Sequence, residues 1–362
     1  MDLLQDSGKD KRNRLMTRIL MIGPGRDVKG GISSVVNNYY SCGLDQRVTL
    51  RYLPTMEDGN KIKKIFVAVK AYLVFCNCIK SYDVLHVHMA AQASFDRKAF
   101  FIRKAKKLSK KIIIHQHAAD FDAYFLEQAD DKKRERIRTV FSMADNVIVL
   151  SKEWEEFFGE HVCDKNKIIV IHNGIMISEV KKKDYLKKNI LMLGRLGERK
   201  GTYDLLEAIP HVLKQIPNCM FYLGGDGDIQ KCRELIKQKN LQDHVSLLGW
   251  IDDAKKKEYF ENCSIFVLPS HHEGMPMALL EAMGHGLASI STNVGGISSV
   301  IENETCGILI QAGDVSQLTR ALIRLLEDSE LRQKIGEAGQ KHIMENFNVE
   351  SGIQKLISLY ES

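Results

Sequence analysis

The chain has 362 residues, of which 44% are hydrophobic and 27% charged, a composition typical of a soluble globular protein. That length favours two domains over a single compact core. The net charge of +6 is uneven: residues 1–180 hold 30 Lys and Arg against 22 Asp and Glu, and the remainder holds 22 against 24. A first half this basic predicts an anionic partner, either a membrane surface or a nucleic acid.

The start of the chain and its cysteines argue against a secreted or membrane-spanning protein. Residues 1–17 are polar and charged, so we expect a flexible tail rather than a signal peptide. The eight cysteines are scattered without a C-x-x-C pair, which disfavours a zinc site or a disulfide framework. The longest apolar run, 65–79, contains Lys70 and is shorter than the roughly 20 residues of a membrane span. We therefore expect a cytoplasmic protein with reduced thiols.

Short runs rich in Ile, Val and Leu alternate with helical patterns along the whole chain. They are continuously apolar, which is typical of strands buried on both faces of a parallel sheet. The predicted fold is α/β, with two Rossmann-like doubly wound domains facing a cleft. The predicted strands are 18–23, 84–88, 112–117, 146–151 and 168–173 in the first half, and 189–194, 219–225, 245–249, 264–269 and 288–292 in the second.

The polar stretch 176–188 is the predicted linker between the domains. It separates a first domain over 18–175 from a second over 189–340, and helical patterns continue to the end of the chain at 341–362. In doubly wound folds ligands bind at the carboxyl ends of the strands, so the residues there carry the functional argument.

Two features follow strands in the first domain. Gly30 and Gly31 open a helical pattern, and their amides could approach a phosphate or sugar closely, although a plain strand-to-helix turn would look the same. A dinucleotide fingerprint is incomplete, because Val28 stands where its last glycine belongs. His115 and His117 alternate at the end of another strand, and His117 at its tip is a candidate catalytic residue.

The second domain opens with two permanent cations. Arg195 directly follows a strand and Lys200 precedes a helix, an arrangement suited to a diphosphate, although solvated surface cations are the alternative. Gly225 and the Gly249–Ile251 segment follow further strands, where glycine permits the close approach of a ring or ribose. A D-x-D pattern at Asp226–Asp228 could suggest a metal-bound diphosphate. It is a weak signal, since the same pattern recurs at 120–122.

Glu273 and Glu281 stand eight positions apart in HHEGMPMALLEAMGHG. Pro276 suits the first turn of a helix, so we expect that helix to begin just after Gly274. Glu273 then lies in a loop and Glu281 in the helix, so the two do not form an acid/base couple.

In order and spacing, these motifs resemble glycosyltransferase family 4, whose members are retaining enzymes of the two-domain GT-B architecture. The matching elements are the glycines at 30–31, His117, NG at 173–174, GRL…KG at 194–201, GGDGD at 224–228, LGW at 248–250 and the E-x7-E pair Glu273 and Glu281. The resemblance implies transfer of a sugar from a nucleotide-sugar donor, a UDP-sugar, with retention and without a metal or other cofactor. It also implies a first domain that selects the acceptor and a last helix that crosses back to it.

The resemblance further implies a role for each matching residue. Arg195 and Lys200 would hold the leaving diphosphate, whose developing charge fixed cations stabilise. Glu281 would accept hydrogen bonds from the ribose, Glu273 would contact the donor sugar, and His117 would reach the sugar or the transferring oxygen. The remaining donor contacts would be Gly30, Gly31, Gly225, Trp250, Ile251, Gly274, Met275 and Pro276. The sequence departs from the family at Leu287, where proline is usual, and at Ser299, where glutamate is common.

The sequence predicts less about the acceptor than about the donor. Segment 61–111 holds 13 basic and two acidic residues around an apolar helical pattern. Either it is a core helix with a basic edge, or it docks on an anionic bilayer to reach a lipid-linked acceptor in polysaccharide or glycolipid synthesis, at the inner face of the membrane. The alternatives to a glycosyltransferase are a nucleotide-sugar epimerase or phosphorylase of the same fold, a metal-dependent transferase using Asp226 and Asp228, and a basic nucleic-acid-binding protein. The last leaves the donor motifs unexplained, so we expect no nucleic acid partner.

Overall fold

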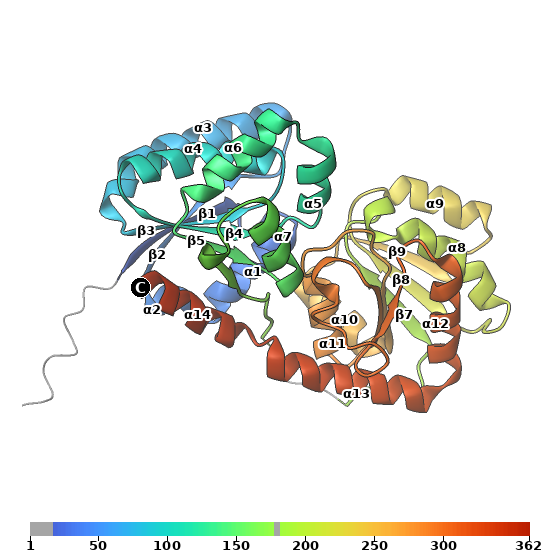
Figure 1. Ribbon diagram of the computed structural model, residues 1–362. Coiled ribbons are helices and arrows are strands. Elements are labelled where there is room, and N and C mark those ends of the chain that lie inside the picture. The colour runs from blue at the N-terminus through green and yellow to red at the C-terminus, as the bar shows by residue number, and fades with distance from the viewer. Residues whose placement is uncertain (1–16, 177–181) are drawn as a thin grey trace, which may run out of the picture.

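The structure, a computed structural model, describes residues 17–176 and 182–362 (Figure 1). Most of the predicted tail 1–17, and positions 177–181 of the predicted linker, lie outside the described residues. Within them, the chain forms two α/β domains, each built on a parallel sheet of six strands.

The first sheet has the order β2-β1-β3-β4-β5-β6, with every neighbouring pair parallel. Helices α3, α4 and α6 cover one face, and α1 lies on the other (Figure 1). The strand order reverses between β1 and β3, which is the switch point where such folds bind ligands. The strands are β1 (Arg18–Pro24), β2 (Thr49–Met56), β3 (Val84–Met89), β4 (Lys111–Gln116), β5 (Asn146–Val149) and β6 (Ile168–Val170). The helices are α1 (Gly31–Ser41), α2 (Leu44–Arg47), α3 (Lys61–Cys78), α4 (Ala93–Lys107), α5 (Phe121–Ala123), α6 (Asp131–Ser142) and α7 (Lys152–His161).

The second sheet has the order β12-β11-β10-β7-β8-β9, which is the strand order of a dinucleotide-binding fold. Its switch point lies between β7 and β10. The strands are β7 (Asn189–Leu193), β8 (Met220–Gly224), β9 (Val245–Gly249), β10 (Ile265–Leu268), β11 (Ala288–Thr292) and β12 (Ile308–Ile310). The helices are α8 (Thr202–Leu213), α9 (Ile229–Gln238), α10 (Asp253–Asn262), α11 (Met277–Gly284), α12 (Val315–Glu327) and α13 (Ser329–Asn346).

All ten predicted strands are present, and two further strands, β2 and β12, were not predicted. Both lie at the edge of their sheet. Exposed residues alternate with partly buried ones through the first half of β2, and the strand contains Pro54, so it lacks the continuous apolar run of a central strand. The strand β12 has only three residues.

The C-terminal region is divided between the domains. Helix α13 runs along the second domain, and α14 (Val349–Glu361) lies against the first (Figure 1). The chain passes between them at Phe347 and Asn348, and Asn348 pairs with Ile175 at the end of the first domain. The segment 341–362 is therefore not one helix, because its first residues belong to α13.

One hydrophobic cluster joins the two domains. It contains Val35 and Val36 of α1, Leu279 and Leu280 of α11, and Ile353 of α14, all buried. The outer faces of the sheets have separate clusters. The domains are thus connected through a shared apolar core as well as through the chain.

Candidate active site

The turn after β7 places Lys200 against the loop after β10. Gly201 adopts a φ of +66°, and a Cβ there would lie 1.9 Å from the carbonyl oxygen of Pro269. Only glycine allows both the left-handed conformation and this approach. The preceding 3-10 turn (Glu198–Lys200) therefore lies directly beside the β10 loop.

Lys200 and Glu273 form an ion pair across these two loops. Their side chains are 13% and 5% exposed, and Ser270 Oγ donates a second hydrogen bond to the same Glu273 oxygen at 2.7 Å. Two partners hold the Glu273 carboxylate in place at the end of β10. Sequence reasoning named Lys200 and Glu273 separately and missed both their contact and Ser270.

Arg195 follows β7 and is exposed. Within the described residues its side chain has neither a hydrogen-bond partner nor an ion-pair partner. The neighbouring loops are tightly packed, because a Cβ at Gly225 would lie 1.7 Å from the carbonyl oxygen of Gly194. The Lys200 side chain lies against Gly194, since a Cβ there would be 3.4 Å from Lys200 Cε, so the turn after β7 carries both cations and can offer them to an anionic ligand.

Glu281 forms an ion pair with Lys256. Its two carboxylate oxygens lie 3.0 and 2.9 Å from Lys256 Nζ of α10. Burial raises the pKa of Glu281, and Lys256 offsets this shift only in part. Burial alone would lower the pKa of Lys256, but the carboxylates of Glu281 and Asp253 outweigh it and raise that pKa.

The helix that carries Glu281 begins at Met277, with Pro276 in the N-cap position. Glu273 therefore lies in the loop and Glu281 more than one turn into α11, as expected from the sequence. The two glutamates have separate lysine partners, so they form two polar positions rather than one carboxylate pair.

His117 follows β4 and belongs to a stack of four histidines. The others are His86 and His88 of β3 and His115 of β4, and neighbouring rings lie 4.1 to 5.5 Å apart. His88 Nδ1 and His117 Nε2 share a hydrogen bond of 2.9 Å. Burial lowers the pKa of His117 to about 3, so its imidazole is neutral at pH 7 and acts as a hydrogen-bonding group rather than a cation.

The stack reaches the C-terminal helix. Tyr360 of α14 and His86 Nδ1 share a hydrogen bond of 2.6 Å, and His86 Nε2 lies 3.3 Å from His115 Nδ1. One nitrogen from each of His86, His88 and His115 lies within 4.8 Å of the others, so these three could hold a metal ion. The planes of their rings, however, are within 16° to 28° of parallel, and lone pairs in stacked planes converge poorly on one ion. Hydrogen bonding between neutral rings therefore fits the geometry better.

The two sets of strand-end loops meet at the domain boundary. A Cβ at Gly274 would lie 3.2 Å from the His117 carbonyl oxygen, so the Glu273–Gly274 loop faces the end of β4. Asn173 donates to the carbonyl oxygen of Met275 at 2.8 Å. The structure thus brings His117, Lys200, Glu273, Gly274 and Met275 into one region, which we call the interdomain site.

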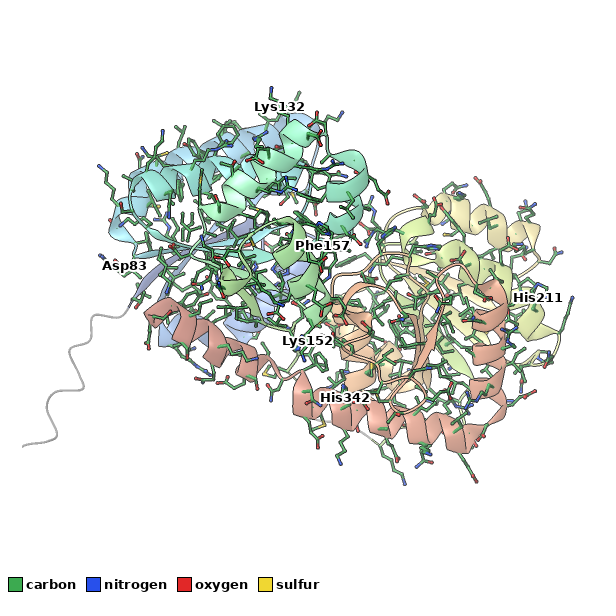
Figure 2. All side chains as sticks on the ribbon, viewed as in Figure 1. Asp83, Lys132, Lys152, Phe157, His211 and His342 are labelled. Atoms are coloured by element: carbon green, nitrogen blue, oxygen red, sulfur yellow. The ribbon has the colours of Figure 1, made fainter. Side chains whose placement is uncertain are left out.

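A second contact at this boundary involves Ser299, the position where the family commonly has glutamate. Ser298 and Ser299 donate to the carboxylate of Glu153 at 2.9 and 3.1 Å. Glu153 belongs to α7, whose first residue, Lys152, is labelled where the domains adjoin in Figure 2. Here the carboxylate comes from the first domain instead of the second.

Other predicted donor contacts follow β9 or open α1. Trp250 is 52% exposed after β9, and Lys29 Nζ lies 5.0 Å from its ring centroid. Gly30 and Gly31 at the start of α1 have open space in front of them, since a Cβ at either position would have no neighbour within 4 Å. Ile251 is partly buried beside Gly224.

The D-x-D pattern at Asp226–Asp228 takes part in the packing of the second domain. Tyr203 donates to the Asp228 carboxylate at 2.6 Å, and the Asp226 carbonyl accepts from the backbone N–H of Leu196. These contacts fix the turn after β8 next to the turn after β7.

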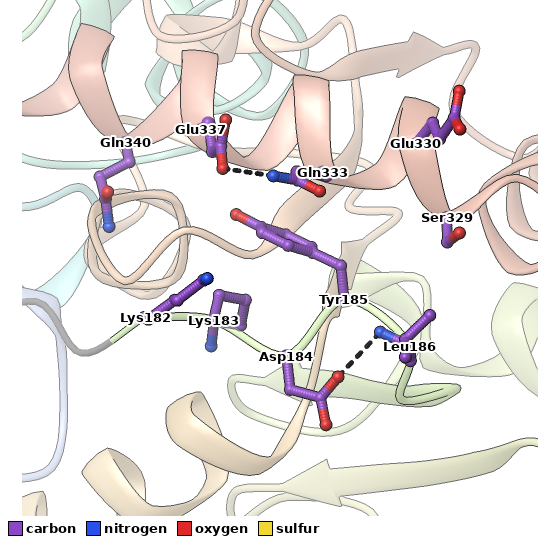
Figure 3. Close-up of a pocket in the computed structure, with 10 residues that line it drawn as sticks. All are labelled: Lys182, Lys183, Asp184, Tyr185, Leu186, Ser329, Glu330, Gln333, Glu337 and Gln340. Atoms are coloured by element: carbon purple, nitrogen blue, oxygen red, sulfur yellow. Dashed lines mark hydrogen bonds between the residues drawn. The ribbon is translucent and has the colours of Figure 1, made fainter.

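A surface pocket elsewhere contains none of the predicted site residues. Figure 3 shows it between the linker and α13. Its lining comprises residues 182–186 together with Ser329, Glu330, Gln333, Glu337 and Gln340.

Sequence reasoning missed the partners that orient the site. Lys256 and Ser270 carry no recognisable motif, because each matters only through a neighbour in space. His86 and His88 were visible as H-x-H at the end of a strand, the same pattern as His115 and His117. That repetition was the available signal for the stack.

Comparison with known proteins gives a consistent picture. Residues 176–342 match the family model of group 1 glycosyl transferases, and residues 46–179 match that of glycosyltransferase family 4. The UDP-Gal:alpha-D-GlcNAc-diphosphoundecaprenol alpha-1,3-galactosyltransferase of Escherichia coli is 28% identical over 346 residues, which cover 88% of this chain and 84% of that protein. The amylovoran biosynthesis glycosyltransferase AmsK of Erwinia amylovora is 28% identical over an alignment of 371 positions, gaps included, which covers 99% of this chain and 84% of AmsK.

The fold is shared with solved structures. Anabaena HepE in complex with UDP and glucose superposes with a TM-score of 0.77 at 15% identity, covering 95% of this chain and 99% of HepE. The two-domain architecture predicted from the sequence is therefore confirmed.

Proposed function

Since the chain belongs to glycosyltransferase family 4, we propose that it moves a sugar from a UDP-linked donor onto a lipid-linked or polysaccharide acceptor. Transfer from a nucleotide sugar is the activity of the family. The base, the acceptor class, retention and independence from metal ions are our proposals for this chain.

The observation that carries the proposal is the pair of cations after β7. Lys200 is largely buried and fixed by Glu273, and Arg195 is exposed on the same rigid turn without a partner among the described residues. When the bond from the anomeric carbon to the diphosphate breaks, negative charge grows on the departing phosphate. Cations held in place beforehand stabilise that charge without reorganising.

We assign the other groups by their positions around these cations. Glu281, oriented by Lys256, accepts hydrogen bonds from the ribose, and Glu273 contacts the donor sugar. Neutral His117 hydrogen-bonds the sugar from the first domain. The acceptor oxygen bonds the anomeric carbon on the face that the diphosphate leaves, and the acceptor proton departs with the diphosphate, so retention needs no carboxylate nucleophile.

A second part of the proposal concerns the metal ion. Arg195 and Lys200 supply the positive charge that a divalent ion would otherwise supply. The Asp228 carboxylate already accepts a hydrogen bond from Tyr203. We therefore expect turnover to survive a chelator.

The acceptor side is assigned to the first domain, over 18–175. The Escherichia coli relative acts, by its name, on a sugar linked to diphosphoundecaprenol, and the Erwinia relative takes part in amylovoran biosynthesis. Both names favour an acceptor on or near a membrane. We propose that this protein works in the cytoplasm at the inner face of the membrane, in polysaccharide or glycolipid synthesis.

The test is a thermal-shift series with nucleotide sugars, followed by turnover with a membrane extract as acceptor. We expect UDP-sugars to raise the melting temperature, and we expect Arg195→Ala or Glu281→Ala to abolish the shift. We also expect Arg195→Ala to lower kcat/KM about 100-fold. The anomeric configuration of the product, read by NMR coupling constants, reports on retention.

The controls separate the alternatives. Arg320→Ala replaces an exposed arginine of α12 that, like Arg195, has no side-chain partner among the described residues, and it is expected to leave the shift unchanged. An epimerase would convert the donor without any acceptor, whereas a transferase needs the extract. If no nucleotide sugar shifts the wild-type protein, the proposed function is wrong.

A further inference from the structure

Helix α3 presents an apolar stripe to the outside of the first domain. Its large side chains at positions spaced three and four residues apart lie on one face, as helical geometry requires. More than half of the surface of each is exposed: Ile62 78%, Ile65 64%, Phe66 66%, Val69 55% and Leu73 61%. We call these five residues the α3 stripe. Contiguous apolar surface of this kind marks an interaction site rather than ordinary exposure.

The first turns of α3 extend beyond the core of the domain. Residues 61–66 are all exposed, and the fully buried positions, Ala71 and Phe75, come only later in the helix. The Asn60 side chain caps the helix by accepting from the Lys63 backbone N–H at 2.8 Å, so the projecting end is a formed helix.

The stripe shares α3 with four lysines, of which Lys63 pairs with Glu57 at 3.4 Å. Segment 61–111 contains 13 basic residues and only Asp83 and Asp96 as acids. Both acids are already paired outside the stripe, Asp83 with Arg18 and Asp96 with Lys133 and Arg136. Lys61, Lys64 and Lys70 are exposed and have no ion-pair partner among the described residues, so they are available to an anionic partner.

The projecting end of α3 lies at the same edge of the sheet as the interdomain site. The loop before α3 contacts the turn before α1: Gly25 N–H donates to the Met56 carbonyl at 2.7 Å, and Lys29 N–H lies 3.5 Å from the Asp58 carboxylate. Gly30 and Gly31 follow directly on that turn. A surface that binds the start of α3 would therefore lie next to the opening of the site.

We propose that the α3 stripe inserts into the interface of an anionic lipid bilayer, with the flanking lysines at the level of the lipid headgroups. Apolar side chains on one face and lysines around them are the arrangement of a helix that lies in a membrane surface. Among the described residues no helix has both the length and the apolarity to cross a bilayer, so the contact is peripheral. That such docking serves an acceptor carried by a lipid rests on the proposed function; the docking itself does not.

Charge decides against the other occupants. A second copy of this chain would bring its own lysines against these lysines, which repels. A nucleic acid would use the lysines but not five apolar side chains between them. An anionic bilayer matches both the charge and the apolar stripe.

The experiment is cosedimentation of the full chain with vesicles of phosphatidylcholine containing phosphatidylglycerol, and with vesicles of phosphatidylcholine alone. We expect binding to the anionic vesicles only. Ile65→Ser/Phe66→Ser should weaken it on the order of tenfold, because both side chains are exposed and their loss does not disturb the core. Leu186→Ser is the matched control, since Leu186 is as exposed as Ile62 but lies in the second half of the chain.

The charge is tested separately. Lys61→Glu/Lys64→Glu/Lys70→Glu should weaken binding on the order of 100-fold, since each lysine contributes roughly fivefold. Lys214→Glu/Lys237→Glu/Lys334→Glu changes the net charge equally on the second domain and should have a much smaller effect. The fluorescence that Phe66→Trp adds to the protein should be quenched by brominated lipids if the side chain enters the bilayer.

Three outcomes overturn the proposal: no binding of the wild-type chain to anionic vesicles, equal weakening by the control variants, or added fluorescence in Phe66→Trp that is indifferent to brominated lipids. If the stripe instead mediates self-association, light scattering will show that the wild-type protein is a dimer and that Ile65→Ser/Phe66→Ser is a monomer. Donor binding is measured in the same variants by thermal shift with a UDP-sugar. Absence of vesicle binding in the wild type with an intact shift refutes docking alone, whereas absence of the shift in the wild type refutes the proposed function alone.

Discussion

Lys200 and Glu273 come from loops after different strands, β7 and β10, yet they form a largely buried ion pair. Each side chain is needed for the other, because a buried charge without a partner is strongly destabilising. A substitution at either position therefore changes stability as well as any role in donor binding. The two effects must be separated before Lys200 is called catalytic.

We expect Lys200→Met to lower the free energy of unfolding by about 3 kcal/mol, since it leaves Glu273 buried and charged. The double variant Lys200→Met/Glu273→Gln should recover more than half of that loss, because no charge remains unpaired. Turnover should remain low in both. Urea unfolding and a kinetic assay give the two quantities, and activity that returns together with stability would show that Lys200 acts only in folding.

The second residue-scale prediction concerns Glu281. Burial raises the pKa of Glu281, and the charge of Lys256 works against this shift. In Lys256→Met the pKa should rise further, so the carboxyl becomes protonated at a higher pH than in the wild type. A protonated carboxyl loses an acceptor for the ribose hydroxyls.

As the pH is lowered, the donor KM of Lys256→Met should therefore begin to increase at a higher pH than that of the wild type. Lys257→Met removes a neighbouring exposed lysine and is the control. A KM of Lys256→Met that does not vary with pH would contradict the role of Glu281 at the ribose.

At the scale of elements, β3, β4 and α14 meet at the histidine stack. His86, His88 and His115 are fully buried, and burial lowers the pKa of each, that of His86 to about 3. A histidine whose pKa is lower in the folded state stabilises the protein above its unfolded pKa near 6.5 and loses that contribution as the pH falls. Below about pH 6.5 these histidines are therefore protonated in the unfolded chain while they stay neutral in the folded chain.

We expect the free energy of unfolding to fall between about pH 6.5 and about pH 5, by about 2 kcal/mol for His86, and we expect His88 and His115 to add to this fall. Urea unfolding across this range measures the slope. His86→Gln should reduce the slope by close to one proton, and His211→Gln, at the far end of the second domain (Figure 2), should not change it. A stability that is flat over this range would mean that the stack is protonated in the folded protein.

Strands and helices with a strong pattern could be predicted, and contacts between them could not. The central strands were visible because burial on both faces requires continuous apolar residues. Edge strand β2 was not, since its exposed residues break that run. Likewise Glu281 was recognisable by its motif, but Lys256 lies 25 positions earlier on a different helix. A single sequence gives no indication that the Glu281 and Lys256 side chains are in contact.

At the scale of the whole molecule, the domains and α14 meet at Gly174. A Cβ on this residue would lie 2.5 Å from Val349 Cα and 2.6 Å from Val349 N, both backbone atoms that cannot rotate away. The adjacent Ile175 pairs with Asn348, and Asn173 donates to Met275 in the second domain. Three consecutive residues therefore connect the first domain, the second domain and the last helix.

We expect Gly174→Ala to displace the start of α14 and lower the free energy of unfolding by about 2–3 kcal/mol. Because the cluster shared by α1, α11 and α14 links the domains, the wild type should unfold in one calorimetric transition and the variant in two. Gly352→Ala is the matched control on α14 itself. Its Cβ would have no neighbour closer than 3.6 Å, so it should be neutral or stabilise by up to about 1 kcal/mol. A single, unshifted transition in Gly174→Ala would show that the last helix adapts without loosening the domains.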